Sequence, residues 1–226
     1  MAAALDFSSV LEQWPLFLDG ARLTVELAGV ATVAGFGLGT LCAIGLRSSG
    51  VVARLCSAYV EAIRNTPLLV QIFLVYFGLA SLGLRLSAFV VAALALTINV
   101  AAYTAEIMRA GLDSIPAGQV EAGECLGLSQ VQLYWHVLLL PAMERVYPAL
   151  ASQFVLLMLA SSVCSQISAE ELTAVANHVQ SETFRPFEAF IVLAGLYIVL
   201  SVLVRGLFWL LGLALFPRRR LLGTAL

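Results

Sequence analysis

The sequence contains no lysine, since all twelve of its basic residues are arginine. This absence excludes two kinds of chemistry from the chain itself. A phosphate-binding Walker A loop requires a lysine, and a Schiff-base enzyme uses a lysine as its nucleophile. If ATP takes part in the function, another chain must therefore bind it.

Histidine and cysteine are also scarce. The two histidines, His136 and His178, are isolated, and the four cysteines show no CxxC spacing. Scattered cysteines in an apolar chain are typical small core residues, and neither residue type forms a ligand set at helical spacing. The sequence therefore predicts no metal site, no cofactor bound by this chain and no catalytic residue.

Charged residues are scarce as well: they make up 12% of the chain, whereas 61% of the residues are hydrophobic. A soluble domain of this length would need more charge to cover its surface. The mean hydropathy of +0.97 instead favours a bilayer. Nucleic acid is excluded as a partner because no basic patch with interleaved aromatic residues occurs. The N-terminus lacks the basic region of a cleaved signal peptide, so we expect the first apolar segment to remain as a span.

Long apolar runs dominate the remainder of the chain. A helix needs about 20 mostly apolar residues to cross the hydrocarbon core. Five segments meet this need, at about Leu23–Leu46, Leu68–Leu84, Leu86–Ile107, Val137–Ala160 and Phe187–Leu207. The sequence thus predicts an all-α integral membrane protein. A transmembrane domain at 20–216 would follow an extracytoplasmic segment at 1–19 and precede a cytoplasmic tail at 217–226.

The positions of the arginines predict the orientation of these spans. The larger arginine group, with a triplet at 218–220, is expected on the cytoplasmic side. This places the N-terminus outside and the C-terminus inside. The larger group contains Arg47, Arg54, Arg109, Arg218, Arg219 and Arg220, whereas Arg22, Arg85 and Arg185 lie on the opposite side.

A row of small residues marks the first predicted span. Ala31, Gly35 and Gly39 are spaced four apart, so they lie on one face of a helix. Such a row lets two helix backbones approach closely. We expect this face to pack against another span.

The loop between the third and fourth predicted spans is polar and contains several helix signals. Ser114 and Pro116 indicate a helix start, and Gly127 can end that helix in the left-handed conformation. Ser129 with Gln132 forms a capping box for the next helix. A short helix at about 116–127 is therefore predicted. From composition alone it is either a solvated connector or a docking helix for a cytoplasmic protein.

The same loop resembles the signature of the permease subunits of bacterial ABC importers, Glu-Ala-Ala followed after three residues by Gly. The chain has Glu121, Ala122, Gly123 and Gly127, so glycine replaces one alanine. The polar amino acid branch of that family is similar over about Gly20 to Arg218. Further matching stretches run from Glu61 to Gln71, from Asn99 to Arg109, over Gly118 and Gln119, and from Glu170 to Leu172.

This resemblance implies a type I ABC importer permease of the MetI-like fold, with five transmembrane helices and a cytoplasmic coupling helix. The expected function is ATP-driven import of polar amino acids, with basic ones as candidates, across the bacterial inner membrane. The chain itself would change no covalent bond. The residues expected to contact the ATP-binding subunits are Gln119, Glu121, Ala122, Gly123 and Gly127.

The resemblance also implies partners. These are a second permease subunit, two ATP-binding subunits that carry ATP and Mg, an extracytoplasmic solute-binding protein, membrane lipid and the amino acid itself. Members of the family commonly have Lys-Asp-Thr-Ser where this chain has 159–162, so a charged pair is missing here. Because an intramembrane carboxylate is usually functional, its absence favours a heterodimer with a sister permease over a homodimer.

A second departure from the family pattern precedes the fourth span. Leu140 and Pro141 stand one residue later than the family's Leu-Pro. The fourth span is therefore expected to begin in a shifted register.

Polar residues within the predicted spans are candidates for a substrate pathway. Asn99, Tyr103 and Glu106 share one face of the third span, which should point at protein or water, and Arg109 can neutralise Glu106. Gln71 and Asn99 either hydrogen-bond neighbouring helices together or line the pathway. Glu144 either has a structural role or accepts the substrate ammonium. The candidate set is Gln71, Asn99, Tyr103, Glu144, Gln153, Ser161 and Ser162.

The residues around Pro67 are expected to form a bend, because proline keeps the preceding residue out of the helical region. Glu61 and Arg64 lie one turn apart before it and are predicted to pair with each other as a cytoplasmic cap, in preference to contacting substrate.

The external segment after the fourth span is predicted to hold a surface helix. Ser168 and Glu171 have the spacing of a capping box, and apolar residues follow at helical spacing from Leu172 to Val179. By resemblance this segment faces the solute-binding protein. Its acidic residues are Glu170, Glu171, Glu182 and Glu188.

Two other functions are weighed against the importer. A secondary amino acid transporter or channel working without ATP needs ion-coupling carboxylates at the midplane and usually inverted repeats. An intramembrane enzyme would need a Ser/His or paired-Asp arrangement within the spans. Neither pattern is evident in the sequence.

Overall fold

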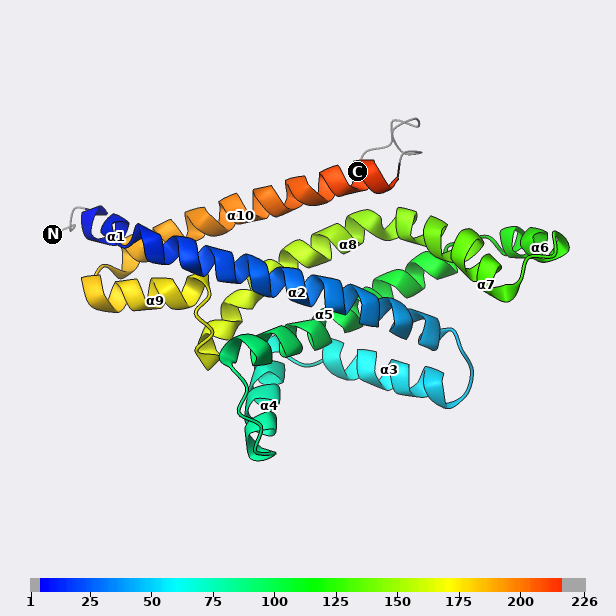
Figure 1. Cartoon of the computed structure of the whole chain (residues 1–226), viewed down its shortest axis with the longest axis horizontal. Helices are drawn as coiled ribbons and strands as arrows, with labels where there is room; N and C mark the ends of the chain where they lie inside the picture. Colours follow the sequence, from blue (N-terminus) through cyan, green and yellow to red (C-terminus); the bar gives the residue numbers. More distant parts are fainter. Residues whose placement is uncertain (1–4, 217–226) are drawn as a thin grey trace.

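A computed structural model describes residues 5–216, and over that range the chain is built of helices joined by short turns (Figure 1). Four long helices run along the molecule: α2 (Trp14–Leu46), α5 (Ala88–Asp113), α8 (Leu140–Ala160) and α10 (Pro186–Leu215). The shorter ones are α1 (Ser8–Glu12), α3 (Val51–Arg64), α4 (Leu68–Ser81), α6 (Ala117–Cys125), α7 (Gln130–Gln132), the π-helix η1 (Leu133–Leu139), the 3₁₀-helix η2 (Ser161–Ile167) and α9 (Leu172–Thr183).

The candidate membrane spans agree with the sequence except at the second one. Within residues 5–216, four stretches are long and apolar enough to cross a bilayer, and α3 with α4 makes a fifth if the bent pair counts as one span. The direction of the chain changes by 111° between the two helices. Because α4 alone has 14 residues and spans about 21 Å, it is shorter than the predicted span Leu68–Leu84 and counts as a span only together with α3.

Helix α5 forms the centre of the molecule. Of its most apolar window 61% is buried, against 17% for α10. Helix α10 exposes apolar side chains such as Val202 and Leu203. An apolar helix that is buried on one side only is suited to a lipid environment, whereas α5 is enclosed by the helices around it.

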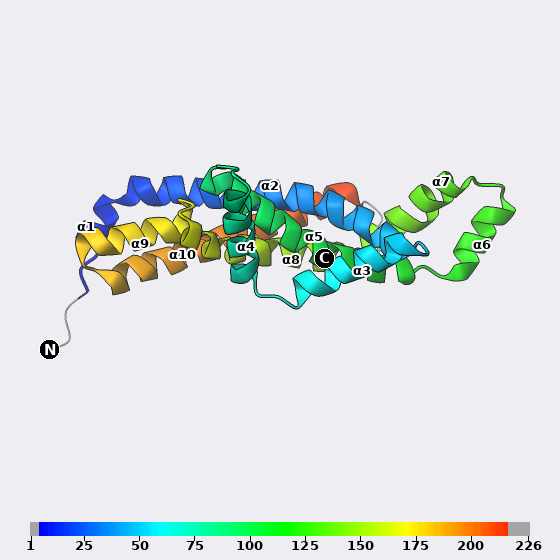
Figure 2. The same ribbon diagram turned by 90° about the horizontal axis from the view of Figure 1, so that it is seen from below.

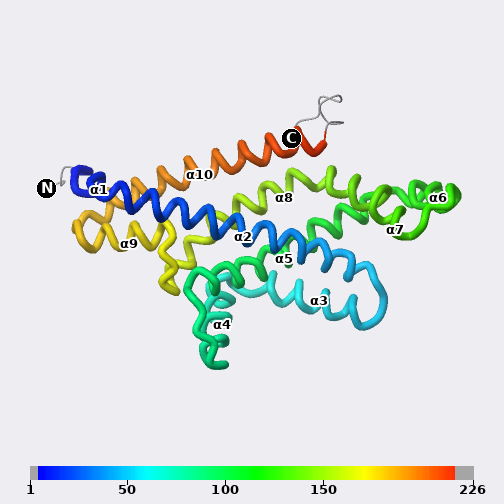
Figure 3. Tube along the Cα trace, in the orientation of Figure 1, coloured from blue at the N-terminus to red at the C-terminus, as the bar shows by residue number. Residues whose placement is uncertain are grey.

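The predicted row of small residues is confirmed as the contact between α2 and α5, which lie side by side along the molecule (Figures 1 and 3). Ala31, Gly35 and Gly39 are all buried on α2. A Cβ added to Gly39 would lie 2.6 Å from the carbonyl oxygen of Ala101. The two helix backbones are therefore so close that position 39 has room for glycine but not for a side chain. Helix α2 also begins at Trp14, within the segment at 1–19.

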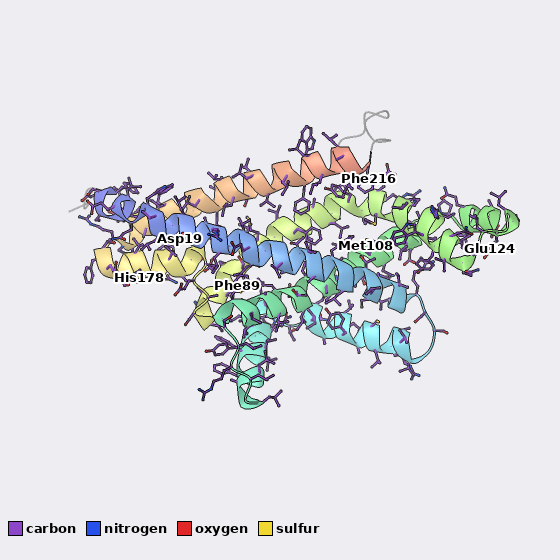
Figure 4. All side chains as sticks on the ribbon, viewed as in Figure 1. Asp19, Phe89, Met108, Glu124, His178 and Phe216 are labelled. Atoms are coloured by element: carbon purple, nitrogen blue, oxygen red, sulfur yellow. The ribbon has the colours of Figure 1, made fainter. Side chains whose placement is uncertain are left out.

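Two pairs of short helices lie at opposite ends of the molecule. Helices α1 and α9 lie at the end with the N-terminus, and α6 and α7 lie beyond the other end of the bundle (Figures 1 and 2). Figure 4 shows the same separation through its labelled side chains, with His178 at one end and Glu124 at the other. The triplet at 218–220 and the tail at 217–226 lie outside the described residues.

Helix α9 packs over the bundle as predicted, through the buried residues Leu172, Ala176 and Val179. The predicted capping box at its start is wrong. Ser168 has a left-handed φ of 60° and ends η2. Glu171 is itself the cap, since its carboxylate accepts hydrogen bonds from the backbone N–H groups of Thr173 (2.9 Å) and Ala174 (3.0 Å).

The acidic surface predicted for this segment is therefore smaller than expected. The Glu171 carboxylate is buried and also accepts a hydrogen bond from the Tyr197 hydroxyl at 2.8 Å. Glu188 is buried too and accepts a hydrogen bond from the backbone N–H of Asp6. Of the four predicted residues, Glu170 and Glu182 remain exposed.

Burial raises the pKa of the Glu171 carboxyl group, although its hydrogen bonds oppose the shift. Because the folded-state pKa is the higher one, the stability cost of the charge is complete above it and is lost as pH falls from the folded-state pKa to the unfolded-state pKa. We expect the unfolding temperature of the wild type, relative to that of Glu171→Gln, to rise as pH is lowered from about 8 towards about 5. Thermal unfolding in detergent measures both temperatures. Glu170→Gln, at the exposed neighbour, is the control. Parallel pH curves for wild type and Glu171→Gln would contradict this account.

The close contact at Gly39 gives a second prediction. In Gly39→Ala the new methyl group meets the carbonyl oxygen of Ala101. This overpacking outweighs the gain of about 1 kcal/mol in helix propensity. We therefore expect the free energy of unfolding to fall by up to about 2 kcal/mol. Gly37→Ala is the matched control, since nothing lies within 4 Å of its Cβ position. The free energies of unfolding of both variants test this, and equal effects at the two sites would refute it.

Candidate functional site

Helix α6 lies on the loop that protrudes at the far end of the bundle from the N-terminus (Figure 1). It begins at Ala117, with Pro116 as its N-cap and no side-chain cap. The predicted capping role of Ser114 is therefore wrong. Ser114 instead ends α5, where its hydroxyl donates to the carbonyl of Gly111 at 2.6 Å.

The C-terminal end of α6 has the predicted form. Gly127 has a left-handed φ of 75°. Its N–H donates to the Glu124 carbonyl at 2.9 Å, and the N–H of Leu128 donates to the Gly123 carbonyl at 3.2 Å. This pair of bonds satisfies the last carbonyl groups of the helix in the manner of a glycine C-cap. The predicted capping box of Ser129 and Gln132 is also present. The loop is consequently a defined helix–turn–helix.

The five predicted coupling residues are not equivalent in the structure. Gln119, Glu121, Ala122 and Gly127 are exposed, whereas Gly123 is buried against the chain's own η1. Apolar residues that the sequence analysis did not select are also exposed on this loop. They are Leu126 (81%), Val131 (79%) and Trp135 (56%). Their signal in the sequence was apolar side chains within an otherwise polar loop.

The π-helix η1 (Leu133–Leu139) lies where a shifted register was predicted, directly before Leu140 and Pro141. A π-turn accommodates an additional residue within a helix, because each N–H bonds five residues back instead of four. The chain therefore continues from α7 through η1 into α8 without a break.

Helix α8 is tied to the start of the loop through Arg145. Its guanidinium donates to the backbone carbonyl of Ser114 and, at 3.1 Å, to the Ser114 hydroxyl. Nearby, a Cβ on Gly111 would meet Val146 Cγ1 at 2.7 Å, so α5 and α8 are in close contact here. Glu144 is half-buried at this end and has no ion pair within residues 5–216.

The bend between α3 and α4 is the second candidate site. Pro67 has extended backbone angles, which leaves carbonyl groups of the preceding turn without helical partners. The amide of Gln71 donates to the carbonyls of Ile63 (2.7 Å) and Thr66 (3.0 Å). The amide of Asn99 donates in turn to the Gln71 side-chain oxygen at 2.9 Å. Two predicted residues thus join α4 to α5 and complete the hydrogen bonding of the bend.

The predicted ion pair of Glu61 with Arg64 is wrong. Glu61 accepts a hydrogen bond from the Ser57 hydroxyl at 3.1 Å. Arg64 reaches across to α5, where its guanidinium lies 3.9 Å from the Glu106 carboxylate and 5.8 Å from the centre of the Tyr103 ring. The shared face of Tyr103 and Glu106 therefore points at α3.

Alternating charges continue from this point towards the loop. Arg109 pairs with Glu106, as predicted, and its guanidinium also lies 3.0 Å from the Asp113 carboxylate. Arg47, just after α2, pairs with the same Asp113 at 2.8 Å. These ion pairs link the ends of α2 and α5 with the last turn of α3.

A groove of about 520 Å³ lies alongside this series of charges. Three arginines and two glutamates line it together with three apolar residues, so both signs of charge face this groove. The lining residues are Leu46, Ala53, Arg54, Ser57, Val60, Glu61, Arg64, Glu106 and Arg109.

The candidates on the fourth span lie elsewhere. Ser161 is buried and donates to the Met158 carbonyl at 2.7 Å, while Gln153 and Ser162 are half-buried. Element η2, which carries both serines, packs against α4 and α5. A separate, largely apolar groove of about 840 Å³ lies between α8 and α10 and includes Arg205. Within residues 5–216, no group of acidic, histidine or cysteine residues could hold a metal ion.

Residues 35–215 match the family model described as binding-protein-dependent transport system inner membrane component. The chain belongs to this family. The permease has relatives over nearly its whole length. It is 37% identical over 223 residues to the octopine transport system permease protein OccM of Rhizobium radiobacter, covering 95% of this chain and 89% of that protein. It is 31% identical over 202 residues to the glutamine transport system permease protein GlnP of Escherichia coli (strain K12), covering 88% and 92%.

Solved structures agree with the fold of the permease. A chain of an amino acid ABC transporter crystallised with histidines superposes with a TM-score of 0.84 and 36% identity, covering 92% of this chain and 98% of that one. The inward-facing MetNI methionine ABC transporter gives a TM-score of 0.74 at 20% identity. The latter likeness supports the type I importer fold alone.

The bend predicts unequal effects for its two amides. Gln71→Leu removes the donor to the Thr66 carbonyl, takes one donor from the Ile63 carbonyl and leaves the Asn99 amide without its acceptor. We therefore expect a loss of about 2 to 4 kcal/mol in stability. Asn99→Leu deprives only the Gln71 side-chain oxygen of a donor and should cost about 1 to 2 kcal/mol. Unfolding midpoints of the purified permease in detergent measure both effects. A larger loss in Asn99→Leu would contradict the assigned roles.

Proposed function

We propose that this permease is the membrane subunit of an ATP-driven importer of polar amino acids, with α6 as its coupling helix. The observation that carries the proposal is the exposed position of Glu121 and Ala122 on a capped helix beyond the bundle. A rigid, polar helix outside the apolar spans can be held by a soluble subunit. The family shown by the comparisons is an ABC importer permease, and they give no support to a transporter that works without ATP.

The partners follow from the same proposal. Two ATP-binding subunits hold ATP and Mg, because this chain has no lysine for a phosphate loop. They would contact α6, which places the α6 end and the C-terminus in the cytoplasm and the α1 and α9 end outside. The solute-binding protein would then dock at the α1 and α9 end. A sister permease completes a heterodimer and supplies the charged substrate contacts that residues 159–162 lack.

For the substrate we propose a pathway beside the bend of α3 and α4. Gln71, Asn99 and Tyr103 lie there, next to the groove that carries both signs of charge. An amino acid carries an ammonium and a carboxylate, and the groove offers partners for both. Gln153, Ser161 and Ser162 would line the side formed by α8 and η2, and Glu144 would lie nearer the cytoplasm. Relatives named for octopine, nopaline and glutamine fit the same class.

Coupling is tested with the reconstituted complex, in which ATP hydrolysis and amino acid uptake are measured together. We expect Glu121→Arg and Gly127→Trp to lower uptake at least tenfold, roughly the effect of losing 1.4 kcal/mol of coupling energy. Glu121→Arg reverses a charge on the exposed face of α6, and Gly127→Trp places a bulky side chain at the left-handed position that ends it. Gly118→Ala, with nothing within 4 Å of its Cβ position, is the control. Normal uptake per ATP in both variants would rule out α6 as the coupling helix.

The energy source is tested in the same vesicles. ATP-driven import should stop with vanadate and survive an uncoupler. The opposite pattern would favour a secondary transporter.

A further inference from the structure

Helix α6 is attached to the rest of the chain by few side chains. Helix α6 packs against η1, and Gly123 is its buried residue. All other residues of α6 are exposed or half-buried. The angle at which α6 projects is therefore set by this contact, by Val120, which packs against the core, and by the turns at its two ends.

Gly123 forms a notch that Leu133 fills. A Cβ added to Gly123 would lie 2.7 Å from Leu133 Cδ1, 3.4 Å from Leu128 Cδ1 and 3.6 Å from Val137 Cγ2. Leu133 is only 3% exposed, so its side chain has little room to withdraw. A side chain larger than hydrogen at position 123 must displace either Leu133 or α6 itself.

The π-turn explains why Leu133 can occupy this notch. Leu133 packs on α6, while Leu138 and Leu139 belong to the buried core of the bundle. In an α-helix, residues five apart lie on different faces, because neighbours on one face are three or four apart. A π-turn bonds residues five apart and brings them towards a common face. It thereby lets one continuous helix pack against both the core and α6.

We propose that Gly123, Leu133 and the π-turn of η1 form a latch that sets the angle of α6 relative to α8, so that Gly123 is a positioning residue. This proposal rests on the proposed function, in which α6 is the coupling helix. It differs from the expectation that Gly123 contacts the ATP-binding subunit, because Gly123 faces inwards. A force on α6 then passes through Leu133 into η1 and α8, a helix that is also fixed to α5 by Arg145 and Ser114.

The latch is tested by a suppressor pair in the reconstituted complex. In Gly123→Ala the methyl group pushes α6 off Leu133, and we expect the ATP hydrolysed per amino acid imported to rise about fivefold. Leu133→Ala vacates the space that this methyl group needs, so the double variant should return towards the wild-type ratio. Leu133→Val, a smaller truncation, serves as a second suppressor in case Leu133→Ala folds poorly. Gly118→Ala on the same helix should leave the ratio unchanged.

Two outcomes would overturn the latch. In one, the defects of Gly123→Ala and the Leu133 variants add instead of compensating. In the other, Gly123→Ala loses binding of the ATP-binding subunits in a pull-down and neither Leu133 variant restores it, which would make Gly123 a direct contact. Failure of the proposed function is seen separately, as normal coupling in Glu121→Arg together with Gly127→Trp.

Discussion

The structure depends on satisfying the backbone where a membrane helix is broken. Hydrocarbon offers no hydrogen bonds, so the carbonyl groups freed by Pro67 need partners from the protein. Gln71 supplies two of these bonds, and Asn99 holds Gln71 to α5. The bend can therefore exist only beside α5, which is in turn packed against the small-residue face of α2. The residues of the bend are themselves exposed, so its polar groups are accessible to a polar molecule beside α5.

Both candidate sites meet on α5. Its middle carries Asn99 and Tyr103, and its last turns carry the ion pairs of Glu106, Arg109 and Asp113. Immediately after it, Ser114 is held by Arg145 of α8, and α6 follows. Under the proposed function, movement of α6 would reach α5, which adjoins the bend and lines the groove, through this contact. Because these contacts are side-chain hydrogen bonds and ion pairs close to the exposed end, they can rearrange without unpacking the apolar core.

Features that depend on local sequence or long periodicity were predictable. The apolar runs gave the long helices, the small residues gave the α2 face, and Gly127 and the Ser129 capping box gave the ends of the loop helices. Features decided by tertiary contacts were not. Arg64 pairs with Glu106 on another helix and not with Glu61 on its own helix. Ser114 and Ser168 have the sequence pattern of N-caps, but each ends the preceding helix. The burial of Gly123 depends on a π-turn, for which the displaced Leu140 and Pro141 were the only sign. The roles of the candidate substrate residues remain predictions.

The location of α6 is the central claim, and the chain contains a native probe for it. Cys125 is exposed on α6, whereas Cys164 is buried and Cys42 and Cys56 are half-buried. The direct measurement is labelling of Cys125 by a membrane-impermeant maleimide in inside-out and right-side-out vesicles. The account predicts labelling from the cytoplasmic face alone and protection when the ATP-binding subunits are bound. Labelling from the outside, or no protection by those subunits, would contradict it.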